Sequence, residues 1–311
     1  MVNDYEVGLT PNPDVLCNQQ IKFDAFFQYA RDKFQCDFVA TGHYARSSPR
    51  EGYPALLAGI DSNKDQTYFL AGLPHSILQH TLFPLGHLTK PEVYRLAEDF
   101  QLPSQVLARK ESMGVCFVGK RSFPQFLSQY LTEQPGQVIA ATSHDVLGMH
   151  SGAFKYTIGQ NPRLGSMPTK QYIVGKDMRA GTLYTSSDPN DTRLFANRVL
   201  LADMRWSRPN IDLEHPTFAR IRHRSALVEA RFKANDACAA TDGLVDTAIT
   251  GYHPELSSSA RFQQALKHIP ASYVAEFKHP VKAAVAGQYA VLYQGEECVG
   301  RGRIVAVDYK T

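Results

Sequence analysis

The feature that most limits how this chain of 311 residues can fold is a change in its pattern near Glu133. Before that point apolar residues recur at helical spacing, and beyond it short alternating segments are separated by Gly, Pro, Asn and Asp. The first pattern predicts an α/β domain, and the second predicts small β-barrels or sandwiches. We expect a second break near Phe195, and hence three domains, which cover residues 1–132, 133–195 and 196–311.

The composition is that of an ordinary globular protein, with 43% hydrophobic and 20% charged residues. No apolar run is long enough to cross a bilayer, and the N-terminus has neither the apolar core of a signal peptide nor an Arg-rich transit sequence. We therefore expect no membrane partner and a cytoplasmic location. The formal net charge of +3 permits a nucleic-acid partner through local basic surfaces without requiring one.

The five cysteines are widely spaced and include no C-x-x-C pair. This spacing excludes a disulfide framework and a zinc site, and we expect no bound metal. It is typical of a reducing compartment, in which each functional cysteine acts singly.

Local patterns place several elements. Capping boxes at Thr89–Glu92 and Ser122–Gln125 predict two helix starts, because a hydroxyl and a Glu or Gln three residues later satisfy the free backbone N–H groups. Beyond the change in pattern we expect short strands over residues 138–141, 153–158, 171–174, 182–185, 217–224, 273–277, 289–293 and 303–308.

Residues 10–18 (TPNPDVLCN) form a rigid stretch near the N-terminus. Two prolines fix the backbone on both sides of Asn12 and bias Asn12 itself toward extended geometry. The segment therefore presents Asn12, Asp14 and Cys17 in a defined arrangement.

The residues that follow, 19–34, predict an amphipathic helix. Cys17 would then lie at or just before the helix N-terminus, where the helix dipole lowers the pKa of a thiol. Two interpretations remain open: a reactive thiol beside the carboxylate of Asp14, or a small apolar side chain in an ordinary loop. The apolar stripe of the predicted helix consists of Phe23, Phe26, Phe27, Ala30 and Phe34.

Two further segments offer candidate ligand-binding residues. Residues 37–41 predict a short buried strand that ends at Gly42 and His43, and ligand residues of α/β sheets lie at the carboxyl ends of strands. Gly42 would let a ligand approach the backbone, whereas His43 by itself is more typical of a hydrogen-bonded loop histidine than of a ligand-binding residue. The polar segment 61–70 either presents donors and a cation to a phosphate or caps a helix with solvated charges.

Two basic segments also stand out. Residues 109–120 form a basic loop that enters a short apolar strand, where Cys116 is either a stabilised thiolate or a core side chain. Residues 217–224 alternate cleanly, so one strand face is either a phosphate-binding stripe or a solvated barrel surface. The arginines of that face are Arg220, Arg222 and Arg224.

Taken together and in order, several stretches over nearly the whole chain resemble the tRNA 2-thiouridylases (tRNA-uridine 2-sulfurtransferases). The resemblance implies an α/β plus β fold: an incomplete adenine-nucleotide-hydrolase-like (Rossmann-like) parallel-sheet domain, a small central β domain and a C-terminal β-barrel. The stretches are TPNPDVLCN at 10–18, IKF at 21–23, ATGHY at 40–44, NKDQ at 63–66, LTK at 88–90, GVCFVG at 114–119, PG at 135–136, YTIGQ at 156–160, GQYAV at 287–291 and CVG at 298–300.

The resemblance also implies a mechanism. Such enzymes use ATP, with Mg²⁺, to adenylate the C2 oxygen of the wobble uridine in certain tRNAs, and a cysteine persulfide then delivers sulfur to C2. By position, Cys116 would carry the persulfide, loaded by a sulfur-donor protein (a desulfurase or a relay protein). Cys17 would attack the persulfide and end in a disulfide with Cys116, while Asp14 would be the neighbouring acid/base group. The binding positions carried over are Gly42 for ATP, and Asn12, Pro13, Asp14, His43, Lys64, Asp65, Gln66, Arg222, His223 and Gln288 for tRNA.

Three departures from the family pattern suggest an alternative. The family begins with a strand and a Ser-Gly-Gly-x-Asp-Ser pyrophosphate loop, and this chain starts downstream of it, so we expect a truncated α/β domain that is inactive alone. Residues 161–165 and Arg301 also differ from the family's arginine and glycine runs, which favours a diverged member, mitochondrial if eukaryotic. The alternative function is a tRNA-binding or sulfur-relay module that has lost ATP-dependent activation.

Overall fold

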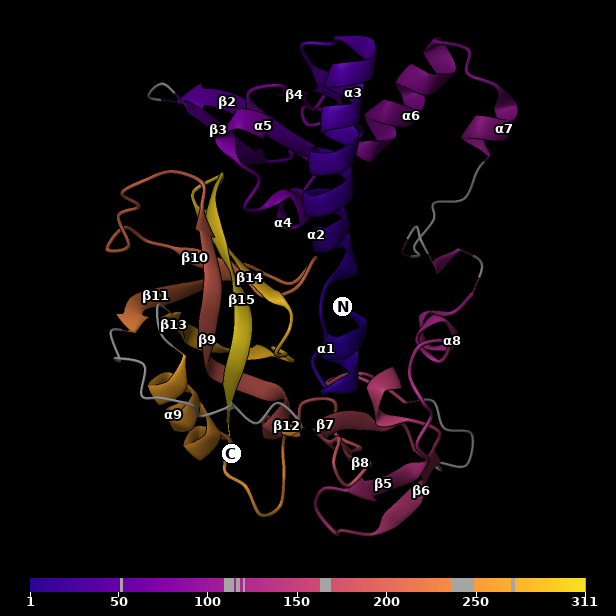
Figure 1. The fold of residues 1–311 in the computed structure, drawn as a ribbon, viewed down its shortest axis with the longest axis vertical. Coiled ribbons are helices and arrows are strands. Elements are labelled where there is room, and N and C mark those ends of the chain that lie inside the picture. The colour runs from indigo at the N-terminus through magenta and orange to yellow at the C-terminus, as the bar shows by residue number, and fades with distance from the viewer. Residues whose placement is uncertain are drawn as a thin grey trace.

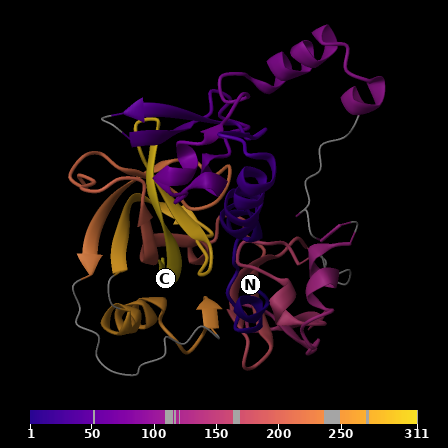
Figure 2. The ribbon, with the colours of Figure 1, turned by 45° about the horizontal axis from the view of Figure 1, so that its top comes forward.

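Figure 1 shows the fold in a computed structural model, which describes residues 1–50, 53–108, 115, 118–119, 121–162, 169–235, 249–269 and 272–310. Seen from both directions in Figures 1 and 2, the first helix, α1 (Val2–Glu6), lies between a barrel and a second, smaller sheet. None of the described helices is both long enough and apolar enough to cross a membrane.

The N-terminal part is mostly helical and includes one short parallel pair of strands. β1 (Val39–Ala40) pairs in parallel with β4 (Thr81–Leu82), which confirms the predicted parallel sheet. β1 is shorter and less buried than predicted, since Ala40 is exposed. The other elements of this part are β2 (Ala45–Arg50), β3 (Tyr53–Ala58), α4 (Thr67–Leu70), α5 (His75–Leu78), α6 (Lys90–Asp99), α7 (Ser104–Leu107) and α8 (Phe123–Leu127). Both predicted capping boxes are confirmed, at the starts of α6 and α8.

One continuous helical run replaces the predicted loop and helix. α2 (Pro13–Cys17), a π-helix, η1 (Asn18–Ala25), and α3 (Phe26–Phe34) follow one another without a break. The prediction that the helix begins near Gln19 is therefore wrong. The apolar stripe is also narrower than predicted, because Phe26 and Phe34 are 51% and 68% exposed. Its buried members are Phe23, Phe27 and Ala30.

The central sheet has the order β12-β7-β8-β5-β6 within the described residues. The predicted strand over 153–158 is wrong, because a 3₁₀-helix, η3 (Ala153–Lys155), occupies that place. A second such helix is η4 (Thr192–Leu194). The strands are β5 (Gly136–Ala140), β6 (Val146–His150), β7 (Tyr172–Asp177), β8 (Thr182–Ser186) and β12 (Ile249–Gly251).

The barrel is formed by six of the described strands in the order β14-β10-β11-β13-β9-β15, and the β14–β15 pairing closes it. Its interior and the central sheet share one apolar core, which includes Val174, Val199 and Val299. α9 (Ser258–His268) packs its buried Phe262 against Leu200 on the outside. The strands are β9 (Phe195–Trp206), β10 (Phe218–Arg220), β11 (Val228–Asn235), β13 (Ser272–Lys282), β14 (Tyr289–Gln294) and β15 (Glu297–Tyr309).

Two strands pair with strands on the other side of a predicted domain boundary. The boundaries themselves remain a prediction. β3 comes from the N-terminal part and extends the barrel sheet, pairing Leu57 with Glu297 of β15. β12 follows barrel strand β11 in the chain and pairs with β7 of the central sheet. The parts of the molecule are therefore joined through backbone pairing as well as side chains.

Candidate functional site

The helix that carries Cys17 begins at a capped N-terminus. The side-chain oxygen of Asn12 accepts hydrogen bonds from the backbone N–H groups of Asp14 (3.1 Å) and Val15 (3.2 Å). Pro13 suits the first helical position because it has no N–H to satisfy. Cys17 therefore lies beyond the first turn, half-buried, and its predicted place at the helix N-terminus is wrong. The dipole, which falls off within one turn, acts on Asp14 more than on the thiol.

The segment before this helix is held from both β modules. The Thr10 N–H donates to the carbonyl of Ala286 in the barrel (2.9 Å), and the Gln288 side chain donates to the Thr10 carbonyl (3.0 Å). The Asn12 side-chain amide donates to the Gln288 oxygen at 3.2 Å. From the central module, the hydroxyl of Thr157 lies 2.9 Å from that of Thr10. The start of the Cys17 helix is thus fixed where three parts of the chain meet.

A set of partly buried ionisable groups surrounds the first helical turns. Burial raises the pKa of the half-buried Asp14 carboxyl, and the charge of Lys22 offsets part of that rise. His43 is 8% exposed, and burial, with a further contribution from Lys22, lowers its pKa to about 4. The His43 ring packs against Phe23, and its Nδ1 lies 2.8 Å from the Thr41 hydroxyl. The site therefore offers a carboxyl of raised pKa and an imidazole that is neutral near pH 7, both under the influence of the Lys22 charge.

Replacing His43 with asparagine is expected to remove part of the pH dependence of stability. Its pKa falls from 6.5 to about 4 on folding, so between these values only the unfolded chain binds the proton. The free energy of unfolding then drops as pH falls through this window, by about 1.4 kcal/mol per pH unit. Urea denaturation at pH 7 and pH 5 should show wild type losing about 2 kcal/mol more than His43→Asn. Equal losses would contradict a buried, neutral His43.

Asp65, predicted to contact RNA, points into the protein. Its carboxylate is buried and accepts hydrogen bonds from the Gly59 N–H (3.1 Å) and the Thr67 hydroxyl (2.8 Å). It also pairs with Arg220 of the barrel at 2.8 Å. This ion pair joins the N-terminal part to the barrel, and it leaves no exposed carboxylate for an RNA to reach.

The neighbours of Asp65 lie nearer the surface. The Gln66 side-chain oxygen accepts a hydrogen bond from the Tyr44 N–H (3.0 Å). Lys64 is half-buried, and the positive charges of Lys90 and Lys64 oppose the burial that raises the pKa of Tyr44. Two ammonium groups and the carboxylate of Asp61 therefore all act on Tyr44.

The predicted arginine stripe is wrong because the strand is too short. β10 ends at Arg220, and Arg222 and Arg224 lie exposed in the loop that follows. The His223 ring packs on Phe69 with a centroid distance of 4.4 Å. Burial and the neighbouring arginines lower the pKa of His223. The loop therefore offers exposed guanidinium groups beside a neutral imidazole that packs at a tilt against Phe69.

Gly42 is exposed and follows β1, at the carboxyl end of the parallel pair. Among the described residues, a Cβ at this position would meet nothing closer than Leu85, at 3.8 Å. A nucleotide can therefore approach the backbone here, which fits the predicted role of Gly42. Within the described residues, no cluster of three or more His, Cys, Asp or Glu side chains could hold a metal ion.

Cys116 and the basic residues beside it lie outside the described residues, so its pairing with Cys17 stays a prediction. On either side of it, Val115 and Val118 pack into an apolar cluster that includes Tyr5 of α1. The chain on both sides of Cys116 is therefore anchored next to the helix that leads into the Cys17 segment.

Arg301 is a residue near the site whose contacts the motifs do not reveal. It is buried, its Nη2 donates to the Gln19 side chain (3.0 Å), and its guanidinium lies 4.3 Å from the centroid of the Tyr289 ring. Burial lowers its pKa. Arg301 thus attaches β15 to the π-helix just beyond Cys17. An arginine between two glycines gives no sequence signal of burial.

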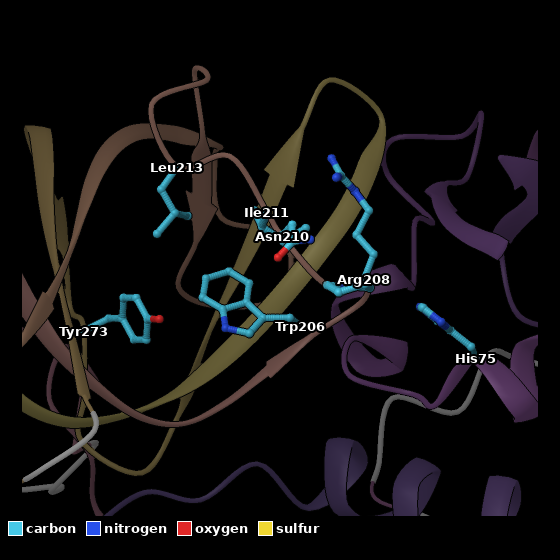
Figure 3. Close-up of a pocket in the computed structure, with 8 residues that line it drawn as sticks. His75, Trp206, Arg208, Asn210, Ile211, Leu213 and Tyr273 are labelled. Atoms are coloured by element: carbon cyan, nitrogen blue, oxygen red, sulfur yellow. The ribbon is translucent and has the colours of Figure 1, made fainter. Parts of the chain in front are cut away.

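A separate cavity of about 550 Å³ lies beside the loop between β9 and β10. Figure 3 shows Trp206 and Tyr273 at this cavity, with ring centroids 5.4 Å apart in an edge-to-face arrangement. Arg208 and Asn210 come from the loop, and His75 comes from α5. No predicted site residue lines this cavity. The one available signal was Trp206, the only tryptophan of the chain.

Three family models match the chain in the predicted order. One described as "tRNA methyl transferase HUP domain" matches residues 1–120, and "tRNA methyl transferase PRC-barrel domain" matches residues 124–187. The third, "Aminomethyltransferase beta-barrel domain", matches residues 258–304. These matches confirm the predicted succession of an α/β domain, a central β domain and a C-terminal β-barrel.

Several curated proteins named tRNA-specific 2-thiouridylase MnmA are similar to this chain. That of Ureaplasma urealyticum serovar 10 is 34% identical over 306 residues, which are 97% of this chain and 71% of the relative. That of Pectobacterium carotovorum is 34% identical over 309 residues, 97% of this chain and 75% of the relative. That of Yersinia pestis (strain Pestoides F) is 36% identical over 307 residues, 97% and 73% of the two chains. The chain therefore belongs to the MnmA family of tRNA-specific 2-thiouridylases.

Proposed function

We propose that this chain is a tRNA-uridine 2-sulfurtransferase, which places sulfur at C2 of the wobble uridine of tRNA. The observation that carries the proposal is the capped helix at the meeting point of the three modules. It holds a half-buried carboxyl of raised pKa, Asp14, and a half-buried thiol, Cys17, on consecutive turns. A thiol and a proton-transferring group are what sulfur transfer requires, and relatives of this family bear the corresponding name.

Cys17 and Cys116 are the two sulfur-handling residues in this proposal. A desulfurase or relay protein loads Cys116 as a persulfide, which keeps the sulfur bound. The Cys17 thiolate attacks the Cys116 sulfur, so the Cys17–Cys116 disulfide forms and hydrosulfide leaves. Hydrosulfide attacks C2 of the uridine, and the activated oxygen departs. A thiol reductant then reduces the disulfide and restores both cysteines.

Asp14 is the proton-transferring residue. Its raised pKa lets the carboxyl take and release a proton nearer neutral pH than an exposed aspartate does. Asp14 takes the proton that hydrosulfide loses as the C–S bond forms. The positive charge of Lys22 opposes the effect of burial and so favours the ionised form of Asp14.

ATP, bound with Mg²⁺, supplies the activation of the C2 oxygen as a leaving group. Of the described residues, Gly42 is the one we assign to the nucleotide, because its backbone is open to a ligand at the end of a parallel strand.

The target uridine has to leave the stacked anticodon loop to reach Cys17. We assign Asn12, Pro13 and Asp14 to the target base. The neutral ring of His43 suits a hydrogen bond better than a phosphate contact. Lys64, Gln66, Arg222 and His223 are assigned to the tRNA around it, with exposed Arg222 facing phosphates. Asp65 does not contact the tRNA in this assignment, because its buried carboxylate is already paired with Arg220, and it stabilises the neighbouring residues instead.

We assign the chain to a reducing compartment such as the cytoplasm, on the wide spacing of its five cysteines in the sequence.

The test uses a host that lacks 2-thiouridine. Mass spectrometry of its tRNA should show 2-thiouridine at the wobble position when the host expresses this chain joined to a segment with the family's Ser-Gly-Gly-x-Asp-Ser loop, the form used for every thiolation measurement. The chain alone should give none, as the sequence predicts. If the joined chain binds tRNA with an affinity that falls with salt and yet no 2-thiouridine forms, the tRNA-binding or sulfur-relay module takes the place of this proposal.

A further inference from the structure

The side-chain amide of Gln288 connects the barrel to the segment before the Cys17 helix at both of its polar ends. Its nitrogen donates to the Thr10 carbonyl at 3.0 Å, and its oxygen accepts from the Asn12 side chain at 3.2 Å. The Tyr68 hydroxyl lies 3.5 Å from the same oxygen but donates its one hydrogen to the Tyr289 carbonyl at 2.9 Å. A carboxamide has two N–H donors and two acceptor positions. One N–H and one acceptor position therefore remain for other partners.

These bonds form a chain with a single consistent direction. The Asn12 oxygen has to face the helix, because it accepts from the N–H groups of Asp14 and Val15. The Asn12 nitrogen then faces the Gln288 oxygen, which in turn directs the Gln288 nitrogen to the Thr10 carbonyl. The barrel thereby holds the very residue that caps the Cys17 helix.

The backbone next to Gln288 reinforces this connection. Gly287 adopts φ +98°, and a Cβ there would lie 2.7 Å from the Thr10 nitrogen, so only glycine allows the two segments to meet. The Gly287 N–H donates to the Ile304 carbonyl, and the Ile304 N–H donates to the Gln288 carbonyl, both at 2.8 Å. The turn that carries Gln288 is therefore fixed to β15 on one side and pressed against Thr10 on the other.

We propose that Gln288 is a positioning residue, which sets the start of the helix that carries Asp14 and Cys17, and that it acts on these residues through Asn12. In this proposal the barrel determines where the side chains of Asp14 and Cys17 lie. The effect on thiolation rests on the function proposed above, whereas the effect on the helix start does not.

The test compares the full chain with Gln288→Met, which removes both polar ends at similar size. The matched control is Gln294→Met at the other end of β14, where the side chain donates to the Asp212 carbonyl (2.7 Å) and the Thr217 hydroxyl (3.0 Å), away from the Cys17 helix.

The decisive readouts are hydrogen exchange of the peptide over residues 12–18 and the rate at which iodoacetamide alkylates Cys17, resolved by peptide mass spectrometry. In Gln288→Met we expect both rates to rise about tenfold, as the loss of two hydrogen bonds from one cap implies. Gln294→Met should match wild type in both rates. For thiolation we expect kcat to fall about tenfold, with the Kd for an unmodified tRNA transcript within twofold of wild type.

Exchange and alkylation rates of Gln288→Met within twofold of wild type would overturn the proposal, whatever the tRNA affinity. A tenfold weaker Kd together with unchanged rates would instead make Gln288 a direct RNA contact. Neither rate depends on turnover, so a chain that makes no 2-thiouridine would overturn the proposed function and still give a result here.

Discussion

Replacing Asp14 with asparagine is expected to lower the thiolation rate by about 10²–10⁴-fold without loss of stability. The amide cannot take the proton that hydrosulfide releases, while its size and its place in the first helical turn are unchanged. Because burial raises the pKa of Asp14 above its unfolded value, the ionised carboxyl costs folding free energy at neutral pH. The variant should therefore be as stable as wild type or slightly more stable at pH 7. This difference should vanish at low pH, where the carboxyl is protonated.

Single-turnover thiolation of an unmodified tRNA transcript measures the rate, and urea denaturation measures the stability. Asp32→Asn is the matched control, because Asp32 is exposed on α3 of the same helical run. We expect it to retain wild-type rate and stability. A thiolation rate for Asp14→Asn within threefold of wild type would contradict the role of Asp14 in proton transfer.

Replacing Asp65 with alanine is expected to lower the free energy of unfolding by about 3–5 kcal/mol. The side chains of Asp65 and Arg220 are 2% and 13% exposed, so the variant leaves a guanidinium nearly buried without its counter-charge. It also leaves the Gly59 N–H without its acceptor. Since a domain is typically stable by about 5–15 kcal/mol, such a loss weakens the whole attachment of the N-terminal part to the barrel.

Urea denaturation with Glu276→Ala as the control tests this expectation. Glu276 pairs with Lys233 at 3.6 Å, but these side chains are 42% and 68% exposed, and such pairs contribute about 0–1 kcal/mol. Replacing both Asp65 and Arg220 with apolar residues of similar size should recover much of the loss. A cost for Asp65→Ala no larger than that for Glu276→Ala would show that the buried pair does not join the modules.

Features set by neighbouring residues could be predicted from the sequence. The capping boxes at Thr89 and Ser122 are confirmed because each needs only a hydroxyl and an acidic or amide side chain three residues later. The order of an α/β domain and two β modules followed from the change in hydrophobic period. The strand β1 was placed correctly, although its burial was not.

Features set by distant partners could not be predicted. The helix starts at Pro13 because Asn12 caps it, and Asn12 is held by Gln288, far away in the sequence. The alternation over residues 217–224 resembles one strand, yet Arg220 leaves the pattern to pair with Asp65 and the strand ends there. The family motifs predict that Asp65 and Gln288 bind tRNA, whereas in the structure their side chains connect the N-terminal part to the barrel.

The most direct test of the central claim is the amount of 2-thiouridine in tRNA from a thiolation-deficient host that expresses Cys17→Ser or Cys36→Ser. Cys36 is the matched control, since it is also a half-buried thiol of the N-terminal part but lies beyond α3, with its Sγ donating to the Ala30 carbonyl. We predict wild-type 2-thiouridine with Cys36→Ser and none with Cys17→Ser. Equal amounts of 2-thiouridine in the two variants would contradict the assignment of Cys17 to sulfur transfer.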